Sequence, residues 1–190
     1  GTDSITGGLG ADTITGGAGA DTIVLTESVA AADIVKYIST TPAGLTVEAG
    51  GDVISGFAAG SGVDVLVFNV DAFDDMAGGT PSTATGAQFV TDMATNADIS
   101  ADGDAFVWQL TGTSDVTTGD NVTQAVAALS NLVVAQAGEV LFVLDDGTDS
   151  YIWLYQGSAT NTSDVDAAEL TLIGSVTGVT AFLDGDIILG

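Results

Sequence analysis

Aspartates recur at every ninth position at the start of the chain. Asp3, Asp12 and Asp21 each end a glycine-containing stretch, and each is followed by Ser or Thr and then Ile. Carboxylates are hard oxygen ligands, and Ca²⁺ takes six to eight such oxygens at about 2.3–2.6 Å. Glycine permits positive φ, so a tight turn beside the aspartate can point its carbonyls at one place. The pattern therefore predicts a Ca²⁺ site made of carboxylates and turn carbonyls.

Short strands must position these aspartates. The residues after each aspartate read Thr-Ile-Thr or a close variant, which suits a three-residue strand of about 10 Å. Ile5, Ile14 and Ile23 occupy the middle of these strands and are expected to face inward. Two nonapeptides then form one coil of a parallel β-roll, in which turns that are two repeats apart stack. Neighbouring carboxylates repel when no ion is bound, so we expect folding of the roll to be coupled to metal binding.

Composition excludes most catalytic chemistry. The 190 residues include 26 acidic side chains and one basic side chain, Lys36, with no His and no Cys, for a net charge of −25. Disulfides, thiol nucleophiles, histidine triads and Cys/His zinc sites are therefore impossible within the chain. Nucleic acids and anionic lipid surfaces are repelled. We expect a protein that is not an enzyme.

The chain nevertheless has the composition of a folded protein. Hydrophobic residues make up 46% and charged residues 14%, whereas disorder combines high net charge with low hydrophobicity. No apolar stretch approaches the roughly 20 residues of a membrane span, so we expect no membrane insertion. No basic and apolar leader is visible. Because the first repeat starts in mid-pattern, we expect the C-terminal piece of a longer protein.

Two full copies of the nonapeptide pattern and part of a third stand in residues 1–27, as GTDSIT, GGLGADTIT and GGAGADTIV. They resemble the RTX, or hemolysin-type calcium-binding, repeat family. The resemblance implies Ca²⁺ ligation by carboxylates and carbonyls at Asp3, Gly8, Leu9, Gly10, Asp12, Gly17, Ala18, Gly19 and Asp21. The alternative is a set of Gly/Asp-rich turns that hold no metal.

One departure affects a single face of the roll. Asp3 and Asp21 are two repeats apart and can share an ion, but Ala30 stands at the position two repeats after Asp12. The face that carries Asp12 therefore needs either an upstream repeat or Asp33.

The segment GDVISGF, followed by GVDVLVF, looks like the segment that closes RTX rolls in type I secreted proteases. This likeness adds Asp52 and Asp64 as candidate Ca²⁺ ligands. The alternative is that both are solvated carboxylates beside strands.

The rest of the chain reads as mostly β. The alternation of Phe106, Trp108 and Leu110 predicts a half-buried strand, and residues 87–94 suit a short helix. Residues 120–133 are the best helix candidate, with Thr118 or Asp120 as the N-cap. Strands are expected at 140–144 and 151–155, joined by the loop DDGTD, and at 169–176 and 187–189. The predicted fold is mainly β: an RTX roll and its closing segment (1–68), then a β-rich, sandwich-like domain with one or two helices and a secretion signal (69–190).

Other candidate motifs have simpler explanations. NTSDVDAAEL (161–170) lacks the glycine and spacing of an EF-hand loop, and tight-turn chemistry explains DDGTD (145–149) without an ion. Tyr151, Trp153 and Tyr155 share one face of a strand and favour core packing over a sugar-binding platform. The acidic and then apolar residues 184–190 resemble the C-termini of type I secretion substrates, and they also suit a last strand.

The resemblance implies a calcium-binding structural region of an exported bacterial surface protein, of the S-layer or adhesin kind. Such proteins leave unfolded through a type I ABC transporter and fold in external Ca²⁺, and copies of the chain or upstream domains are expected neighbours in a surface lattice. The alternative is the accessory tail of a secreted hydrolase whose catalytic domain lies upstream. An ice- or carbohydrate-binding solenoid would need longer Thr arrays than these repeats supply.

Overall fold

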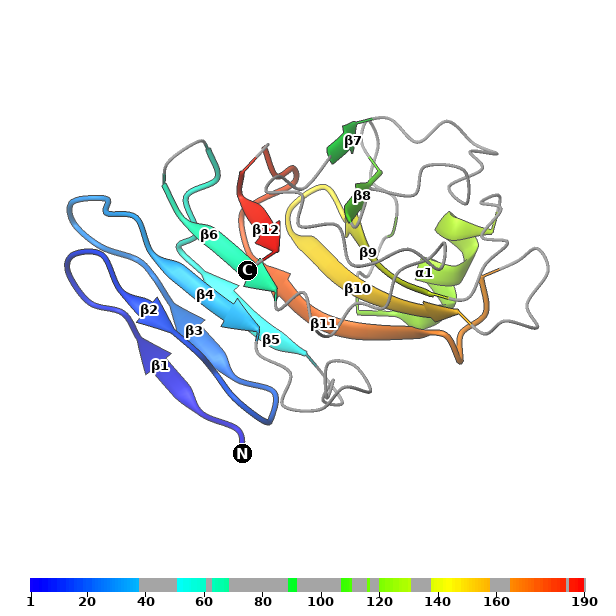
Figure 1. Ribbon diagram of the computed structural model, residues 1–190, viewed down its shortest axis with the longest axis horizontal. Helices are drawn as coiled ribbons and strands as arrows, with labels where there is room; N and C mark the ends of the chain where they lie inside the picture. The colour runs from blue at the N-terminus through cyan, green and yellow to red at the C-terminus, as the bar shows by residue number, and fades with distance from the viewer. Residues whose placement is uncertain are drawn as a thin grey trace.

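A computed structural model describes residues 1–37, 51–60, 63–68, 89–91, 107–110, 116, 120–130, 138–157, 165–183 and 185–189. These residues form twelve strands and one helix, so the chain is mainly β, as the sequence predicts. The strands make two sheets, one of eight strands and one of four (Figure 1). Among the described residues, no helix has the length and hydrophobicity to cross a bilayer.

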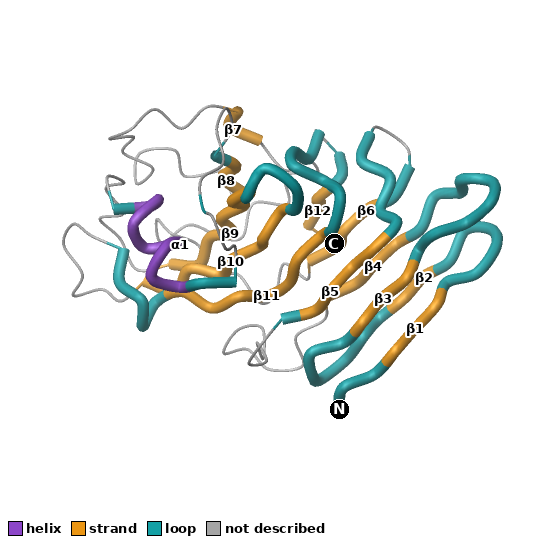
Figure 2. The backbone as a smooth tube through the Cα atoms, turned by 180° about the vertical axis from the view of Figure 1, so that it is seen from behind, coloured by secondary structure: helices purple, strands orange, loops and turns teal. Residues whose placement is uncertain are grey.

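The N-terminal part is a parallel β-roll. The chain passes alternately between the two sheets, and Figure 2 shows the resulting stack of short strands from behind. The eight-stranded sheet receives β1 (Ser4–Thr6), β3 (Thr22–Val24) and β5 (Asp52–Ser55). The four-stranded sheet receives β2 (Thr13–Ile14), β4 (Ile34–Tyr37) and β6 (Val65–Phe68). Ser4 pairs with Thr22, so the first coil is two nonapeptides long, as predicted.

The inside of the roll is apolar because each short strand turns an aliphatic side chain inward. Ile14, Ile23, Val35, Ile54 and Leu66 are all buried, and Ile5 packs against the same core. The Thr and Ser side chains that flank these residues in β1, β2 and β3 are mostly exposed, which is the alternation that a strand requires. Tyr37 and Phe68 stack inside the roll, with ring centroids 4.7 Å apart.

The C-terminal strands extend the sheets of the roll. β11 (Leu170–Val176) pairs in parallel with β5. It is followed across the sheet by β10 (Ser150–Gly157), β9 (Gly138–Asp145), β8 (Val107–Gln109) and β7 (Phe89–Thr91). β12 (Ile187–Leu189) pairs with β6 in the other sheet. Both sheets therefore contain strands from before and after residue 68, and the division at that residue stays a prediction.

A second core lies around helix α1 (Val122–Leu129). Ala125 and Leu129 of the helix are fully buried with Trp153, Tyr155 and further residues of β8, β9 and β10. Trp153 and Tyr155 are 2% and 0% exposed, so the aromatic stripe is core packing, as predicted.

Several local predictions were wrong. Phe89–Thr91 is a strand and not part of a helix, since its aromatic and β-branched residues pair with β8. Asn121 caps α1 in place of Thr118 or Asp120, and its Oδ1 accepts from the Thr123 N–H at 3.0 Å. β8 is buried on both faces because Val107 lies in one core and Trp108 lies in the other. Val133 and residues 161–164 lie outside the described residues.

Candidate metal centre

Aspartates on one side of the roll are joined into a ladder by hydrogen bonds from backbone to carboxylate. The Asp3 N–H donates to Asp21 Oδ1 at 2.7 Å, and the Asp21 N–H donates to Asp52 Oδ1 at 2.9 Å. Each of these aspartates stands immediately before its strand or is the first residue of it. The three residues follow one another across β1, β3 and β5, and we call them the first aspartate ladder.

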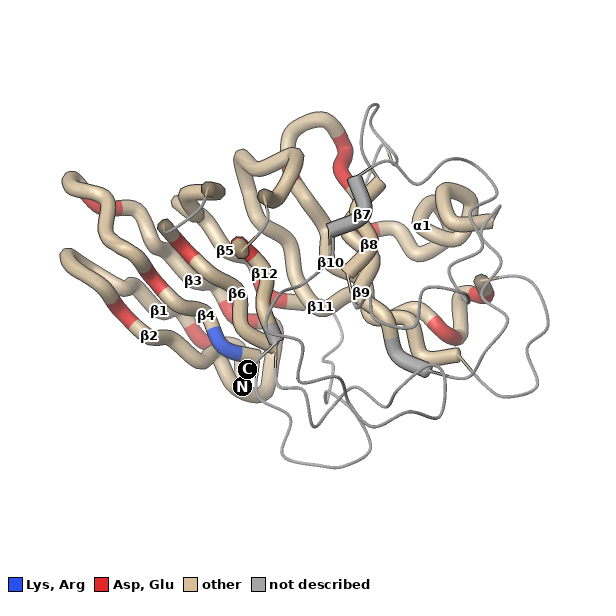
Figure 3. The backbone as a smooth tube through the Cα atoms, turned by 45° about the horizontal axis from the view of Figure 1, so that its top comes forward, with Lys and Arg blue, Asp and Glu red and all other residues tan. Residues whose placement is uncertain are grey.

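A second aspartate ladder lies along β2, β4 and β6. The Asp12 N–H donates to Asp33 Oδ1 at 2.8 Å, and the Asp33 N–H donates to Asp64 Oδ1 at 2.9 Å. The structure thus supplies Asp33 as the partner of Asp12, which was one of the two options left open by the sequence. The rows of acidic residues across the roll are visible in Figure 3.

The strands fix the register of both ladders. The carbonyls of Asp3, Asp12, Asp21 and Asp33 each accept an N–H from the next coil, as in Thr22 to Asp3 and Ile34 to Asp12, both at 2.8 Å. The spacing along a ladder is 18 residues from Asp3 to Asp21, 21 from Asp12 to Asp33 and 31 from Asp21 to Asp52. Strand pairing therefore aligns the aspartates, while the connections between strands absorb the extra residues.

The two complete nonapeptide turns have the same backbone conformation. Gly8 and Gly10 have φ values of 104° and 94°, and Gly17 and Gly19 have values of 91° and 126°. These values lie in the left-handed region that glycine enters without steric cost. Leu9, between the first pair, is 76% exposed, so the turn presents its backbone and not a buried side chain.

In both turns, one carboxylate oxygen has no partner. Asp12 Oδ2 and Asp21 Oδ2 are buried and accept no hydrogen bond. Asp21 as a whole is only 1% exposed. A Cβ atom added to Gly16 would lie 2.6 Å from Asp21 Oδ2, and one added to Gly7 would lie 3.3 Å from Asp12 Oδ2. The partnerless oxygens therefore lie against the glycines that begin their own turns.

This arrangement fits Ca²⁺. A buried carboxylate oxygen without a partner is costly, and a divalent cation beside it offsets that cost. Within the described part of the chain, no three acidic, His or Cys side chains converge on one point. A Ca²⁺ ion in these turns would therefore take most of its oxygens from backbone carbonyls and water. The carbonyl candidates Gly8, Leu9, Gly10, Gly17, Ala18 and Gly19 belong to these two turns.

Asp52 and Asp64, the two candidates from the closing segment, both belong to the ladders. They are 8% and 3% exposed, so they are not solvated carboxylates. Asp64 uses both oxygens, since Oδ2 accepts from the Ala58 N–H at 2.8 Å. Ligation by either residue stays a prediction.

Burial and the carboxylates of the ladders change the pKa values of Asp33 and Tyr37. Burial raises the pKa of Asp33; the Asp12 N–H lowers it, and the carboxylates of Asp64, Glu27 and Asp12 raise it. Burial and the neighbouring carboxylates of Asp52 and Asp21 raise the pKa of the Tyr37 hydroxyl well above its ordinary value.

The predicted ligand set did not include three acidic residues that hold the ladders and the loops of the roll. Asp33 completes the second ladder, Glu27 accepts from the N–H groups of Gly10 and Ala31, and Asp186 binds the loop before β6. A sequence signal exists for Asp33: like the repeat aspartates, it stands two residues before a buried aliphatic side chain, here Val35. Glu27 and Asp186 carry no such signal.

Comparison with protein families identifies the N-terminal repeats. Residues 1–26 match the family model described as RTX calcium-binding nonapeptide repeat (4 copies). The chain therefore carries RTX repeats, as predicted, and Ca²⁺ is the ion that such repeats bind. Comparison with curated proteins and with solved structures gives no match.

Proposed function

We propose that this chain is the calcium-binding structural region of an exported bacterial cell-surface protein, of the S-layer or adhesin kind, which folds on Ca²⁺ after type I secretion. The observation that carries the proposal is the pair of buried, partnerless oxygens, Asp12 Oδ2 and Asp21 Oδ2, in two turns of matching backbone. The RTX match to residues 1–26 supports calcium as the ion and secretion as the destination.

The proposal makes the role structural and not catalytic. An extracellular medium rich in Ca²⁺ supplies the counter-charge that a chain of net charge −25 lacks. Inside a cell, where free Ca²⁺ is scarce, the repeat aspartates repel one another and the repeats stay open. This coupling lets the chain cross an exporter unfolded and become ordered outside.

Calorimetry on Asp21→Asn tests the metal assignment. The asparagine keeps an acceptor for the Asp3 N–H and removes the charge beside Gly16, so the hydrogen bond to the preceding coil is retained. We expect Ca²⁺ affinity to fall at least about tenfold, or about 1.4 kcal/mol. Asp166→Asn is the matched control, because Asp166 is exposed and its hydrogen bonds run through its backbone. Equal affinities for the two variants would reject the site.

An export assay tests the destination. Deleting residues 184–190 removes the candidate secretion signal, and we expect the chain to stay inside cells that carry a type I exporter. The control exchanges the repeat aspartates Asp12 and Asp21 for Asn, which leaves the C-terminus unchanged and should leave export intact. Normal export of the deletion variant would reject the signal. A zinc-protease or serine-hydrolase motif in an upstream segment of the same protein would favour the accessory tail of a secreted hydrolase.

A further inference from the structure

The two ends of the roll satisfy their buried carboxylates in different ways. At the N-terminal end, Asp12 Oδ2 and Asp21 Oδ2 have no partner. At the opposite end, Asp64 Oδ1 accepts from the Asp33 N–H at 2.9 Å, and its Oδ2 accepts from the Ala58 N–H at 2.8 Å. The buried Oδ2 atoms of Asp12 and Asp21 therefore lack a hydrogen-bond donor, whereas both oxygens of Asp64 already have one.

Asp186 has the same arrangement as Asp64. Its Oδ1 accepts from the Gly60 N–H at 2.9 Å and its Oδ2 from the Leu183 N–H at 2.7 Å. Asp186 is 0% exposed, so it is a fully buried carboxylate between two donors. Hydrogen bonds from N–H groups to a carboxylate are the stronger, charge-assisted kind. They take the place that a cation has in the nonapeptide turns.

These bonds tie together segments that are distant in the sequence. Gly60 precedes β6, and Asp186 precedes β12, 126 residues further along. The Leu66 N–H also donates to the Asp186 carbonyl at 2.7 Å, and β12 then pairs with β6. Gly185, with φ of 96°, forms the tight turn in which the Asp186 N–H returns to the Leu183 carbonyl.

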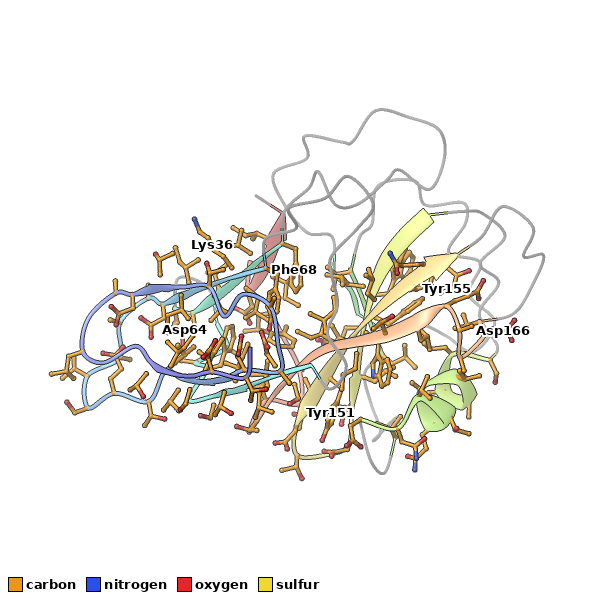
Figure 4. The ribbon with its side chains drawn as sticks, turned by 90° about the horizontal axis from the view of Figure 1, so that it is seen from below. Lys36, Asp64, Phe68, Tyr151, Tyr155 and Asp166 are labelled. Atoms are coloured by element: carbon orange, nitrogen blue, oxygen red, sulfur yellow. The ribbon has the colours of Figure 1, made fainter. Side chains whose placement is uncertain are left out.

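Apolar contacts close the same end. Phe182 and Ile187, on either side of Asp186, are 1% and 0% exposed. The Phe182 ring meets Phe57 edge-on, with centroids 5.6 Å apart. We call this unit, made of the described residues within 57–68 and 182–189, the closed end of the roll. Figure 4 shows Phe68 toward the interior of the roll and Lys36 pointing outward.

We propose that the closed end is held without metal, by N–H groups that donate to Asp64 and Asp186, whereas the coils of β1 to β4 become ordered only with Ca²⁺. This inference rests on the proposed function, because it divides the roll into a calcium-dependent part and a calcium-independent part. Asp64 and Asp186 are then structural carboxylates, and Asp12 and Asp21 are the ligands.

Hydrogen exchange of the full chain, read at single amides by NMR with Ca²⁺ and with EGTA, tests the division. On Ca²⁺ removal we expect exchange at Asp3 and Thr22 to accelerate by about 100-fold or more, because these amides lie in the opened coils. Exchange at Gly60 and Leu183 should change less than about threefold. Equal acceleration at all four amides would overturn the inference and leave the proposed function standing. If none of the four amides exchanged faster, both the inference and the calcium-dependent folding in the proposed function would be overturned.

A pair of variants isolates Asp186. Asp186→Asn keeps Oδ1 for Gly60 but replaces the acceptor of the Leu183 N–H with an amide group, so exchange at Leu183 should rise by about tenfold with or without Ca²⁺. Its Ca²⁺ affinity should match that of the Asp166→Asn control. Gly185→Ala, which strains the same turn without a clash, is the milder variant if Asp186→Asn does not fold. A rise seen only in EGTA would mean that Ca²⁺ supports the closed end, and would overturn the inference.

Discussion

The two oxygens of Asp21 have different tasks. Asp21 Oδ1 holds the N–H of Asp3 in the preceding coil, whereas Oδ2 faces Gly16 in its own turn and is left without a partner. A glutamate would place its carboxylate one methylene further from the backbone and lose one of these two positions. An asparagine can keep the first task but not the charge of the second. Aspartate therefore suits both tasks: it aligns the coil, and its second oxygen is the ligand that we propose for the ion.

The close approach of Gly16 to Asp21 Oδ2 predicts that this position tolerates no larger residue. A Cβ on Gly16 would lie 2.6 Å from that oxygen, so Gly16→Ala must push the carboxylate out of place. We expect Ca²⁺ affinity to fall about tenfold, or about 1.4 kcal/mol, as measured by calorimetry. Gly1→Ala is the control, because its Cβ would lie 3.9 Å from Asp3 Oδ2, an ordinary contact. Unchanged affinity in Gly16→Ala would mean that Asp21 Oδ2 is not a ligand.

Away from the metal centre, the DDGTD hairpin makes a pH prediction. Burial opposes the charge of Asp146, but N–H groups of Asp149 and Thr148 and the Tyr151 hydroxyl hold its pKa below the ordinary value. A lowered folded pKa gives stability that is present above the unfolded value of 3.8 and is lost as pH falls through the folded value. We expect Asp146→Asn to lower the melting temperature by about 2–4 °C at pH 7 and to cost less at pH 3.

The same pair affects Tyr151. Burial, followed by the hydrogen bond to Asp146, raises the pKa of Tyr151 to about 12. Because the folded pKa is raised, the protonated Tyr151 contributes folding stability that is complete below the unfolded pKa of 10. This contribution is lost as pH rises through the folded pKa. A phenolate absorbance titration should therefore show Tyr151 ionising closer to 10 in Asp146→Asn. A pKa that stays near 12 would assign the shift to burial alone.

At the scale of elements, the sequence predicts best what local periodicity controls. The nonapeptide repeat correctly predicted the inward isoleucines and the two-repeat register of β1 and β3. The hairpin of β9 and β10 was also predicted, since its turn residues stand between two apolar runs. The strand at Phe89–Thr91 was missed because its neighbour, β8, lies in a different part of the sequence.

Helix α1 makes a prediction at this scale. Asn121 Oδ1 accepts from the N–H groups of Thr123 and Gln124 at the start of the helix. We expect Asn121→Ala to destabilise the chain by about 1 kcal/mol, as measured by urea unfolding in Ca²⁺. Asn121→Asp keeps the acceptor and adds a charge that the helix N-terminus favours, so it should be neutral or stabilising. Equal losses in both variants would mean that the cap does not act through its side-chain oxygen.

At the scale of the whole molecule, the sequence pattern could not predict which distant segments pair. β5 joins β11 and β6 joins β12, so the C-terminal strands continue the two sheets of the roll. Asp186 lies 126 residues from the Gly60 that it binds, and no repeat links the two. The candidate site was predictable because its aspartates and glycines lie within one repeat. Its metal-free counterpart was not, because donor and acceptor come together only in the folded sheet.

Because the chain has a net charge of −25, salt and Ca²⁺ can both stabilise it. The last prediction distinguishes screening of charge repulsion by salt from binding of Ca²⁺ at the repeats. At 1 M NaCl the Debye length is about 3 Å, so repulsion between exposed carboxylates is largely screened. Screening cannot provide a partner for buried atoms such as Asp12 Oδ2 and Asp21 Oδ2. We therefore expect 1 M NaCl to raise the melting temperature of the Ca²⁺-free chain while Asp3 and Thr22 still exchange rapidly. Millimolar Ca²⁺ should protect these amides at an ionic strength too low to screen. If NaCl alone protected them, the repeat aspartates would be a repulsive surface and not an ion site.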